Sequence, residues 1–121
     1  MQNLEQVRAR NALYFAKTVG AISGDFGGEA IKKIPPLILN HGLLATAAYS
    51  FTEKEGWQKT FDALASHLSD PDIAILPAGT TNRQKMMDFL VSKDATSETL
   101  KLATAEAMAW FAYAKRFVKK A

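Results

Sequence analysis

The sequence predicts an all-α protein, a single compact bundle of five or six helices in one domain, residues 1–121. In most segments apolar side chains recur at steps of three or four residues, which is the spacing of an amphipathic helix. No segment keeps the period-two alternation of a strand, and no Asn-Gly or Asp-Gly pair marks a hairpin turn. Glycine- and proline-containing loops separate the helical segments from one another.

Two helices are expected before Gly42. The first covers about residues 2–22, where these apolar residues share one broad face: Leu4, Val7, Ala12, Phe15, Val19 and Ile22. The second covers about residues 29–39. Pro35 and Pro36 predict a kink or a restart inside it, because proline removes a backbone donor and clashes with the preceding turn. Gly42 suits the left-handed cap that closes this segment.

The third and fourth helices are expected at about residues 43–54 and 57–68, with a stop near Gly56 between them. The fourth carries a clear apolar stripe made of Trp57, Phe61, Leu64, Ala65 and Leu68. After a loop, Thr81 and Gln84 have the spacing of a capping box, with the threonine at the cap. A fifth helix should follow this cap to about residue 92.

The loop of residues 69–81 contains an apolar segment, residues 73–76. This segment either tucks against the core or forms a docking patch, and tucking is favoured because apolar loop residues usually cover the core. The last helix begins after Thr96 and runs to the end of the chain. Its expected buried face consists of Leu100, Ala103, Ala107, Trp110, Ala114 and Phe117.

Cysteine is absent, which excludes a disulfide framework and any cysteine-ligated metal or iron–sulfur site. The absence fits a reducing compartment, and a cytoplasmic location is expected. Residues 1–5 lack a basic segment followed by an apolar core, so no signal peptide is expected. No apolar run approaches about 18 residues, so no membrane span is expected.

Few residues could carry catalysis, and none forms a recognised motif. The only histidines, His41 and His67, lack metal-site spacing and are expected at helix ends as surface residues or dipole partners. Asp70 and Asp72 flank a proline, where a turn is favoured over a nuclease site. Phosphate-binding glycine motifs and a nucleophile elbow are missing from the sequence. We therefore expect no enzyme activity, no cofactor and no metal.

The formal net charge is +3, and the basic surplus lies in residues 31–60 and 95–121. Lys115 and Arg116 occupy the last turns of a helix, where the dipole alone explains them. Arg83 and Lys85 occupy a first turn, where a cation costs about 0.3–1 kcal/mol, and this unexplained cost hints at a phosphate partner. For two residues beside the predicted kink, a phosphate contact and a solvated surface are equally favoured: Lys32 and Lys33. Three residues could stack on bases but are expected more often in the core: Tyr14, Tyr49 and Tyr113.

Four short motifs follow one another along the chain. They are residues 4–12 with the pair Arg8-Ala9, residues 32–35 with Lys-Lys-Ile-Pro, Gly42-Leu43 with Thr46 three residues on, and the closing segments 103–107 and 115–117. In this order and spacing they resemble the small helical subunit, the fifth subunit, of the Cmr complex. That complex is the type III-B CRISPR effector, which uses a guide RNA to capture target RNA in antiviral defence. The resemblance spans nearly the whole chain.

The resemblance implies a non-catalytic subunit that holds the guide and target RNA through sequence-independent backbone contacts. Its implied partners are the other subunits of the Cmr complex, the guide RNA, the target RNA and further copies of itself within the complex. The candidate RNA-binding residues on a basic face are Arg8, Arg10, Lys17, Lys32, Lys33, Arg83, Lys85, Lys115 and Arg116. Two alternatives stay open. One is a type III-A small subunit of similar size, and the other is a helical protein–protein adaptor without RNA contact, which would dock through residues 73–76.

Overall fold

The structure, a computed structural model, describes residues 3–20 and 29–118 and contains six α-helices and one π-helical segment in that part of the chain. In order these are α1 (Leu4–Phe15), η1 (Ala16–Gly20), α2 (Glu29–His41), α3 (Leu43–Tyr49), α4 (Glu55–Leu68), α5 (Arg83–Leu90) and α6 (Ser97–Phe117). None of the described residues lies in a strand. The predicted all-α class is therefore confirmed.

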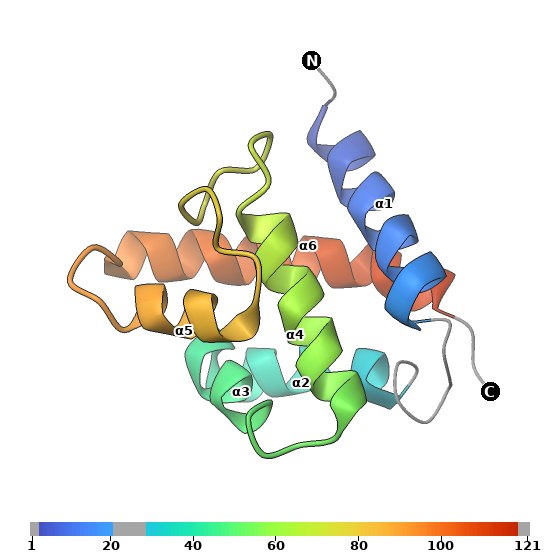
Figure 1. The fold of residues 1–121 in the computed structure, drawn as a ribbon, viewed down its shortest axis with the longest axis horizontal. Coiled ribbons are helices and arrows are strands. Elements are labelled where there is room, and N and C mark those ends of the chain that lie inside the picture. Colours follow the sequence, from blue (N-terminus) through green and yellow to red (C-terminus); the bar gives the residue numbers. More distant parts are fainter. Residues whose placement is uncertain (1–2, 21–28, 119–121) are drawn as a thin grey trace.

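The other helices pack around α6, the longest helix of the described chain (Figure 1). α1 lies at one end of the molecule, α5 lies at the other, and α4 crosses α6 between them. α2 and α3 close the remaining side and pack against α6. The largest fully buried side chains are the aromatic ones of Trp110, Phe15, Phe61 and Phe111, so the core lies where α1, α4 and α6 meet.

A capping box starts α1 two residues later than predicted. The Asn3 side chain accepts the Gln6 backbone N–H at 2.8 Å, and the Gln6 side chain accepts the Asn3 backbone N–H at 3.0 Å. Val7 and Phe15 of the predicted face are buried, whereas Leu4 is 49% exposed. The α-helix gives way to η1 after Phe15, and the predicted end at residue 22 lies outside the described residues.

The helix α2 runs through both of its prolines without a break, so of the two predicted alternatives the restart is wrong and the kink stays a prediction. Ile31, Ile34 and Ile38 are buried on one face of α2, and this packing outweighs the hydrogen bonds that the prolines remove. The predicted ending is confirmed. Gly42 has φ 89°, in the left-handed region that glycine favours, and its N–H donates to the Ile38 carbonyl at 2.8 Å.

The boundary between the third and fourth helices was predicted too late. α3 ends at Tyr49 rather than near residue 54, because tight turns follow in which the N–H groups of Ser50 and Phe51 donate to carbonyls three residues back. The Ser50 hydroxyl also donates to the Ala47 carbonyl at 2.6 Å. α4 then begins at Glu55, so the glycine expected between the two helices lies within the first turn of α4.

The second half of the apolar segment in the 69–81 loop tucks inward, as predicted, whereas Ala74 is exposed. Leu76 is 3% exposed, Ile75 packs partly against the core, and the N–H groups of both donate to the Leu68 carbonyl at 3.0 Å. The predicted cap of the next helix is wrong by one residue. Asn82, not Thr81, caps α5, since its side chain accepts the Lys85 N–H at 2.9 Å.

The helix α6 starts where the sequence predicted. Thr96 accepts the Thr99 N–H at 3.1 Å and caps it. Four residues of the predicted stripe are fully buried: Ala103, Ala107, Trp110 and Ala114. Leu100 and Phe117 are partly buried against the same core. Glu106, a charged residue, shares this buried face.

Candidate nucleic-acid interface

The last turns of α6 carry two exposed cations from the predicted set. Lys115 and Arg116 are both exposed, and neither forms an ion pair within residues 3–20 and 29–118. Their positive charge is favourable beside the negative end of the helix dipole. Both side chains are accessible to a phosphate group.

Arg8 is tied to α6. Its Nε and Nη2 atoms donate to the two carboxylate oxygens of Glu106, each at 2.7 Å. The Glu106 side chain is 7% exposed and that of Arg8 is 26% exposed. A two-pronged guanidinium–carboxylate pair is among the strongest charge-assisted contacts. Arg8 therefore fastens α1 to α6, and its predicted contact with RNA stays a prediction.

The other two cations of the first helical region differ from each other. Arg10 donates from Nη2 to Asp70 Oδ2 at 2.9 Å and lies 3.9 Å from Asp72, yet 45% of its side chain is exposed. Lys17, in η1, is exposed and makes no ion pair with any described residue. Arg10 can reach a phosphate only while sharing its charge with Asp70, whereas Lys17 offers its whole charge.

Arg83 has a local partner that the sequence did not reveal. Its backbone N–H donates to Asp62 Oδ1 at 2.8 Å, and its Nη1 atom lies 3.1 and 3.2 Å from the two Asp62 oxygens. The guanidinium also lies over the Phe51 ring, 5.4 Å from its centroid. The sequence suggested that the positive charge of Arg83 in a first helical turn has an unfavourable free energy with no local compensation. That argument is wrong for Arg83, because Asp62 offsets the cost. Lys85 is exposed and has no ion pair in the described part of the chain.

The nine predicted cations lie in three regions. The first region consists of α1, η1 and the last turns of α6. The Tyr113 hydroxyl on α6 donates to Glu5 on α1 at 2.9 Å and so links these helices. The second group, Arg83 and Lys85, lies in the first turn of α5, where Arg83 is bonded to Asp62 of α4. The third group, Lys32 and Lys33, is exposed on α2. The structure thus does not gather all nine residues at one place.

A buried polar network links α1, α4 and α6 around His67. The ring is 1% exposed, with Nε2 3.0 Å from Glu106 Oε2 and Nδ1 2.9 Å from Asn11 Nδ2. The same Asn11 nitrogen donates to Asp70 Oδ2 at 3.1 Å. The Asn11 amide is thereby a donor to Nδ1, so the hydrogen of a neutral ring lies on Nε2 and is donated to Glu106. The expectation of a surface histidine at this position is wrong.

A signal for this network exists in the sequence. Glu106 follows Ala103 by three residues and precedes Trp110 by four, so it stands in the apolar stripe of the last helix. A carboxylate on a buried helical face requires a buried partner, because an unpaired charge is too costly there. Its partner Arg8, however, is 98 residues away in the chain, and no local pattern identifies it.

The network shifts the pKa values of its members downward. Burial lowers the pKa of His67 and outweighs the opposing hydrogen bond from Glu106. For Glu106, burial acts upward, but the hydrogen bonds from Arg8 and His67 hold its pKa below the usual range. Asp70 is similar: burial acts upward, while the Asp72 N–H, Asn11 and Arg10 together lower its pKa. The preferred state near neutral pH is a neutral ring between two carboxylates.

This network predicts a stability that falls with acidity. A folded-state pKa of His67 below the unfolded value of about 6.5 means that the unfolded chain takes up the proton first as the pH drops. The contribution of His67 is therefore complete above about pH 7 and is lost progressively as the pH falls below the unfolded pKa of about 6.5 and through the lower folded pKa. His67→Gln retains an N–H donor near Glu106 without titrating in this range. We expect this variant to flatten the dependence of the free energy of unfolding on pH between 7 and 5, measured by urea unfolding.

His41→Gln is the matched control, because His41 lies exposed at the end of α2 and the chain has only two histidines. This control should keep the pH dependence, since His67 remains. A slope equally steep in His67→Gln and the parent chain would contradict the assigned neutral ring. Glu106 and Asp70 affect stability at lower pH than His67 does. Because their folded-state pKa values are depressed, they add stability above about pH 4.5, and this stability is lost on further acidification.

The acidic turn after α4 holds the backbone in place. The Asp72 N–H donates to Asp70 Oδ1 at 2.9 Å, which confirms the predicted turn role of Asp70. Among the described residues, no three His, Cys, Asp or Glu side chains are grouped to hold a metal ion. Within the same residues, no helix has the length and apolar character needed to cross a membrane.

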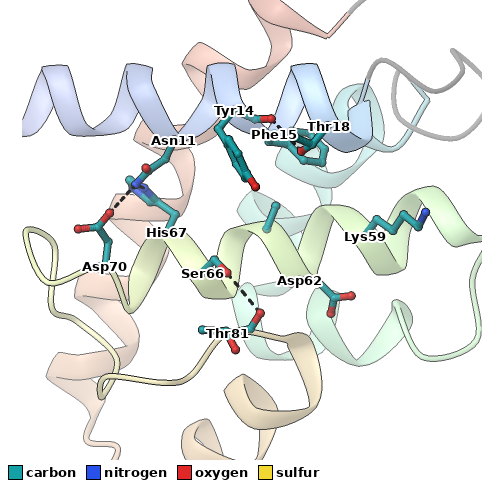
Figure 2. A pocket seen from close by; sticks show the side chains of 11 residues that line it. Asn11, Tyr14, Phe15, Thr18, Lys59, Asp62, Ser66, His67, Asp70 and Thr81 are labelled. Carbon is teal, nitrogen blue, oxygen red and sulfur yellow. Dashed lines mark hydrogen bonds between the residues drawn. The ribbon is translucent and has the colours of Figure 1, made fainter.

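A cleft of about 570 Å³ lies between α1 and α4 (Figure 2). Tyr14 projects from α1 toward α4, and Ser66 and Thr81 lie on the opposite wall. Lys59 and Asp62 line one end, and the other end consists of three members of the buried network: Asn11, His67 and Asp70. Tyr14 is 70% exposed and Tyr49, on α3, is 54% exposed. The prediction that these tyrosines lie in the core was therefore wrong for both.

Comparisons with known proteins agree on one family. A family model described as CRISPR-associated protein (Cas_Cmr5) matches residues 4–121. No curated protein matches. A crystal structure of a CRISPR-associated Cmr5 family protein from Thermus thermophilus superposes with a TM-score of 0.73 at 22% sequence identity, covering 97% of this chain and 96% of that one. At this identity the superposition establishes a shared fold.

Proposed function

The chain belongs to the Cmr5 family of CRISPR-associated proteins, and from this membership we propose that it is the non-catalytic small subunit of a type III-B (Cmr) ribonucleoprotein effector in antiviral defence. Its partners are then the other subunits of the complex and the guide and target RNA. The observation that carries the proposal is the family match over residues 4–121. The family name favours the type III-B complex over its type III-A counterpart.

We further propose that the exposed cations contact the RNA backbone without reading its sequence. Four of them support this best, since they are exposed and form no ion pair with another described residue: Lys17, Lys85, Lys115 and Arg116. Arg8 and Arg83 are weaker candidates, because each already holds a carboxylate at 2.7–3.2 Å and only about a quarter of its side chain is exposed. Arg10 is also paired, with Asp70 at 2.9 Å, but 45% of its side chain is exposed. A phosphate contact by either would first have to displace Glu106 or Asp62. The adaptor alternative loses support, because Leu76 of its docking segment is buried and Ile75 packs against the core.

The test removes two charges at a time. In the complex purified through a tag on this chain, Lys115→Gln with Arg116→Gln should reduce RNA affinity at low salt. The two lost phosphate contacts should also flatten the dependence of log K on log salt by about 1.4 units on single-stranded RNA, since each contact contributes about 0.7. The measurement is a fluorescence-anisotropy titration at several salt concentrations.

The matched control changes the net charge equally at two exposed lysines outside the proposed contacts, Lys93→Gln with Lys101→Gln. This control should leave the slope within about half a unit of the parent value. An identical slope in both double variants and the parent chain would contradict the assigned contacts at the end of α6. Recovery of protein partners with no RNA in the purified complex would instead favour the adaptor.

A further inference from the structure

The cleft between α1 and α4 is electrically balanced, although charged groups line it. Asp62 holds Arg83 at 3.1 Å, Asp70 holds Arg10 at 2.9 Å, and Lys59 pairs with Glu55 at 2.7 Å. Each charge in the wall is thus already matched by one of opposite sign. A phosphate placed inside would face two carboxylates without gaining an unshared cation. The cleft therefore favours a neutral ligand over an anion.

The free hydrogen-bonding groups of the cleft are neutral. The hydroxyl groups of Tyr14 and Thr81 have no hydrogen-bond partner among the described residues. The Ser66 hydroxyl donates to the Thr81 carbonyl at 3.3 Å, so its oxygen can still accept. Phe15 and Ala63 supply apolar surface on the wall. A flat ligand with an apolar face and polar edges would find complementary groups here (Figure 2).

Tyr14 also stands between two cations on α1 and its extension. Arg10 precedes it by four residues on the same face of α1, and Lys17 follows it by three residues in η1. The two cations are separated by about 10 Å along the helix axis. An aromatic ring between cations, beside a cleft, is the arrangement that holds the base of a single strand while the backbone runs past.

We propose that the cleft between α1 and α4 takes one unpaired RNA base, stacked on Tyr14, with Arg10 and Lys17 contacting the phosphates on either side. The volume of about 570 Å³ accommodates a base with its sugar. The inference rests on the proposed RNA-binding function and adds to it a specific site for a single-stranded nucleotide. A base in a continuous duplex cannot enter, because its face is covered by its neighbours.

The test compares an RNA with its base-free counterpart. The full chain, labelled with ¹⁵N, is titrated with the tetranucleotide A4 and with a tetranucleotide of the same backbone that lacks the bases. The intact RNA should shift the amide resonances of Tyr14, Ser66 and Thr81, and the abasic strand should not. Tyr14→Ala should weaken binding of A4 by about 5- to 150-fold, the usual range for loss of one base–aromatic stack. Tyr14→Phe should retain most of the affinity.

Tyr49→Ala is the matched control, because Tyr49 is another exposed tyrosine, on α3 and outside the cleft. It should leave both the shifts and the affinity unchanged. Equal shifts from the two tetranucleotides, or equal losses in both alanine variants, would overturn the base site.

If A4 shifts only resonances near Lys115 and Arg116, the base site is wrong while the proposed backbone contacts stand. If no resonance moves at millimolar RNA, both proposals fail, whereas shifts at the cleft alone refute only the backbone contacts.

Discussion

Glu106→Ala is expected to lower the free energy of unfolding by about 3 kcal/mol, a large part of the stability of a domain of this size. Glu106 is 7% exposed; its Oε1 accepts from Arg8 Nη2, and its Oε2 accepts from both Arg8 Nε and His67 Nε2. Its removal leaves a guanidinium and a ring N–H without an acceptor beside the core. Arg8 is 26% exposed and regains some water, which places the loss at the lower end of the range for broken buried pairs.

The measurement is equilibrium urea unfolding, with the m-value as a check that the transition stays two-state. Glu98→Ala is the matched control on the same helix, because Glu98 is exposed in the first turn of α6 and should cost only about 0.3–1 kcal/mol. The double variant with Arg8→Ala should lose less than the sum of the single losses, by at least about 1 kcal/mol. Similar losses in Glu106→Ala and Glu98→Ala would show that the network does not hold α1 on α6.

This result would also bear on the proposed RNA contacts. If Arg8 acts mainly through Glu106, then Arg8→Ala should reduce stability while leaving the salt dependence of RNA binding unchanged. Lys115 and Arg116 should behave in the opposite way. Arg8 carries the same charge as Lys115 and Arg116. It differs from them in the fold, because Arg8 is paired with Glu106 whereas the other two are exposed.

The helices with the strongest apolar periodicity were predictable from sequence. α4 and α6 carry buried residues every three or four positions, and the start of α6 was found from Thr96. The end of α3 was not predictable, because the turns after Tyr49 depend on local hydrogen bonds such as that of the Ser50 hydroxyl. The uninterrupted α2 was not predictable either, because the burial of its isoleucines outweighs a local proline rule.

The candidate site was predictable only as a set of charges. Sequence composition identified the cations, and the exposed ones at Lys17, Lys85 and the end of α6 remain candidates. The pairing of Arg83 with Asp62, 21 residues away, could not be found, because it depends on how α5 packs on α4. The cleft beside Tyr14 likewise arises from the packing of α1 against α4. Contacts of this kind follow from the tertiary fold rather than from helical periodicity.

Trp110→Ala should lower the free energy of unfolding by about 3–5 kcal/mol, the largest single loss that we expect. Trp110 is fully buried, and its ring centroid lies 5.0 Å from that of Phe111, 5.4 Å from Phe15 and 6.0 Å from His67. Its removal leaves a cavity where α1, α4 and α6 meet, and the lining rings lose their contacts outright. Urea unfolding can be followed by the remaining tryptophan, Trp57 on α4.

Trp110→Phe separates the packing of this side chain from its polar atom. The indole N–H is buried and has no acceptor among the described residues, and such a group costs about 1–3 kcal/mol. Phenylalanine removes that cost while keeping an aromatic ring, so we expect less than half the loss seen with alanine. Val91→Ala, at a side chain that is 65% exposed, should change stability by no more than about 0.5 kcal/mol. Equal losses in the phenylalanine and alanine variants would mean that the indole nitrogen is bonded in solution, and that the junction of the three helices depends on this bond rather than on packing of an aromatic ring.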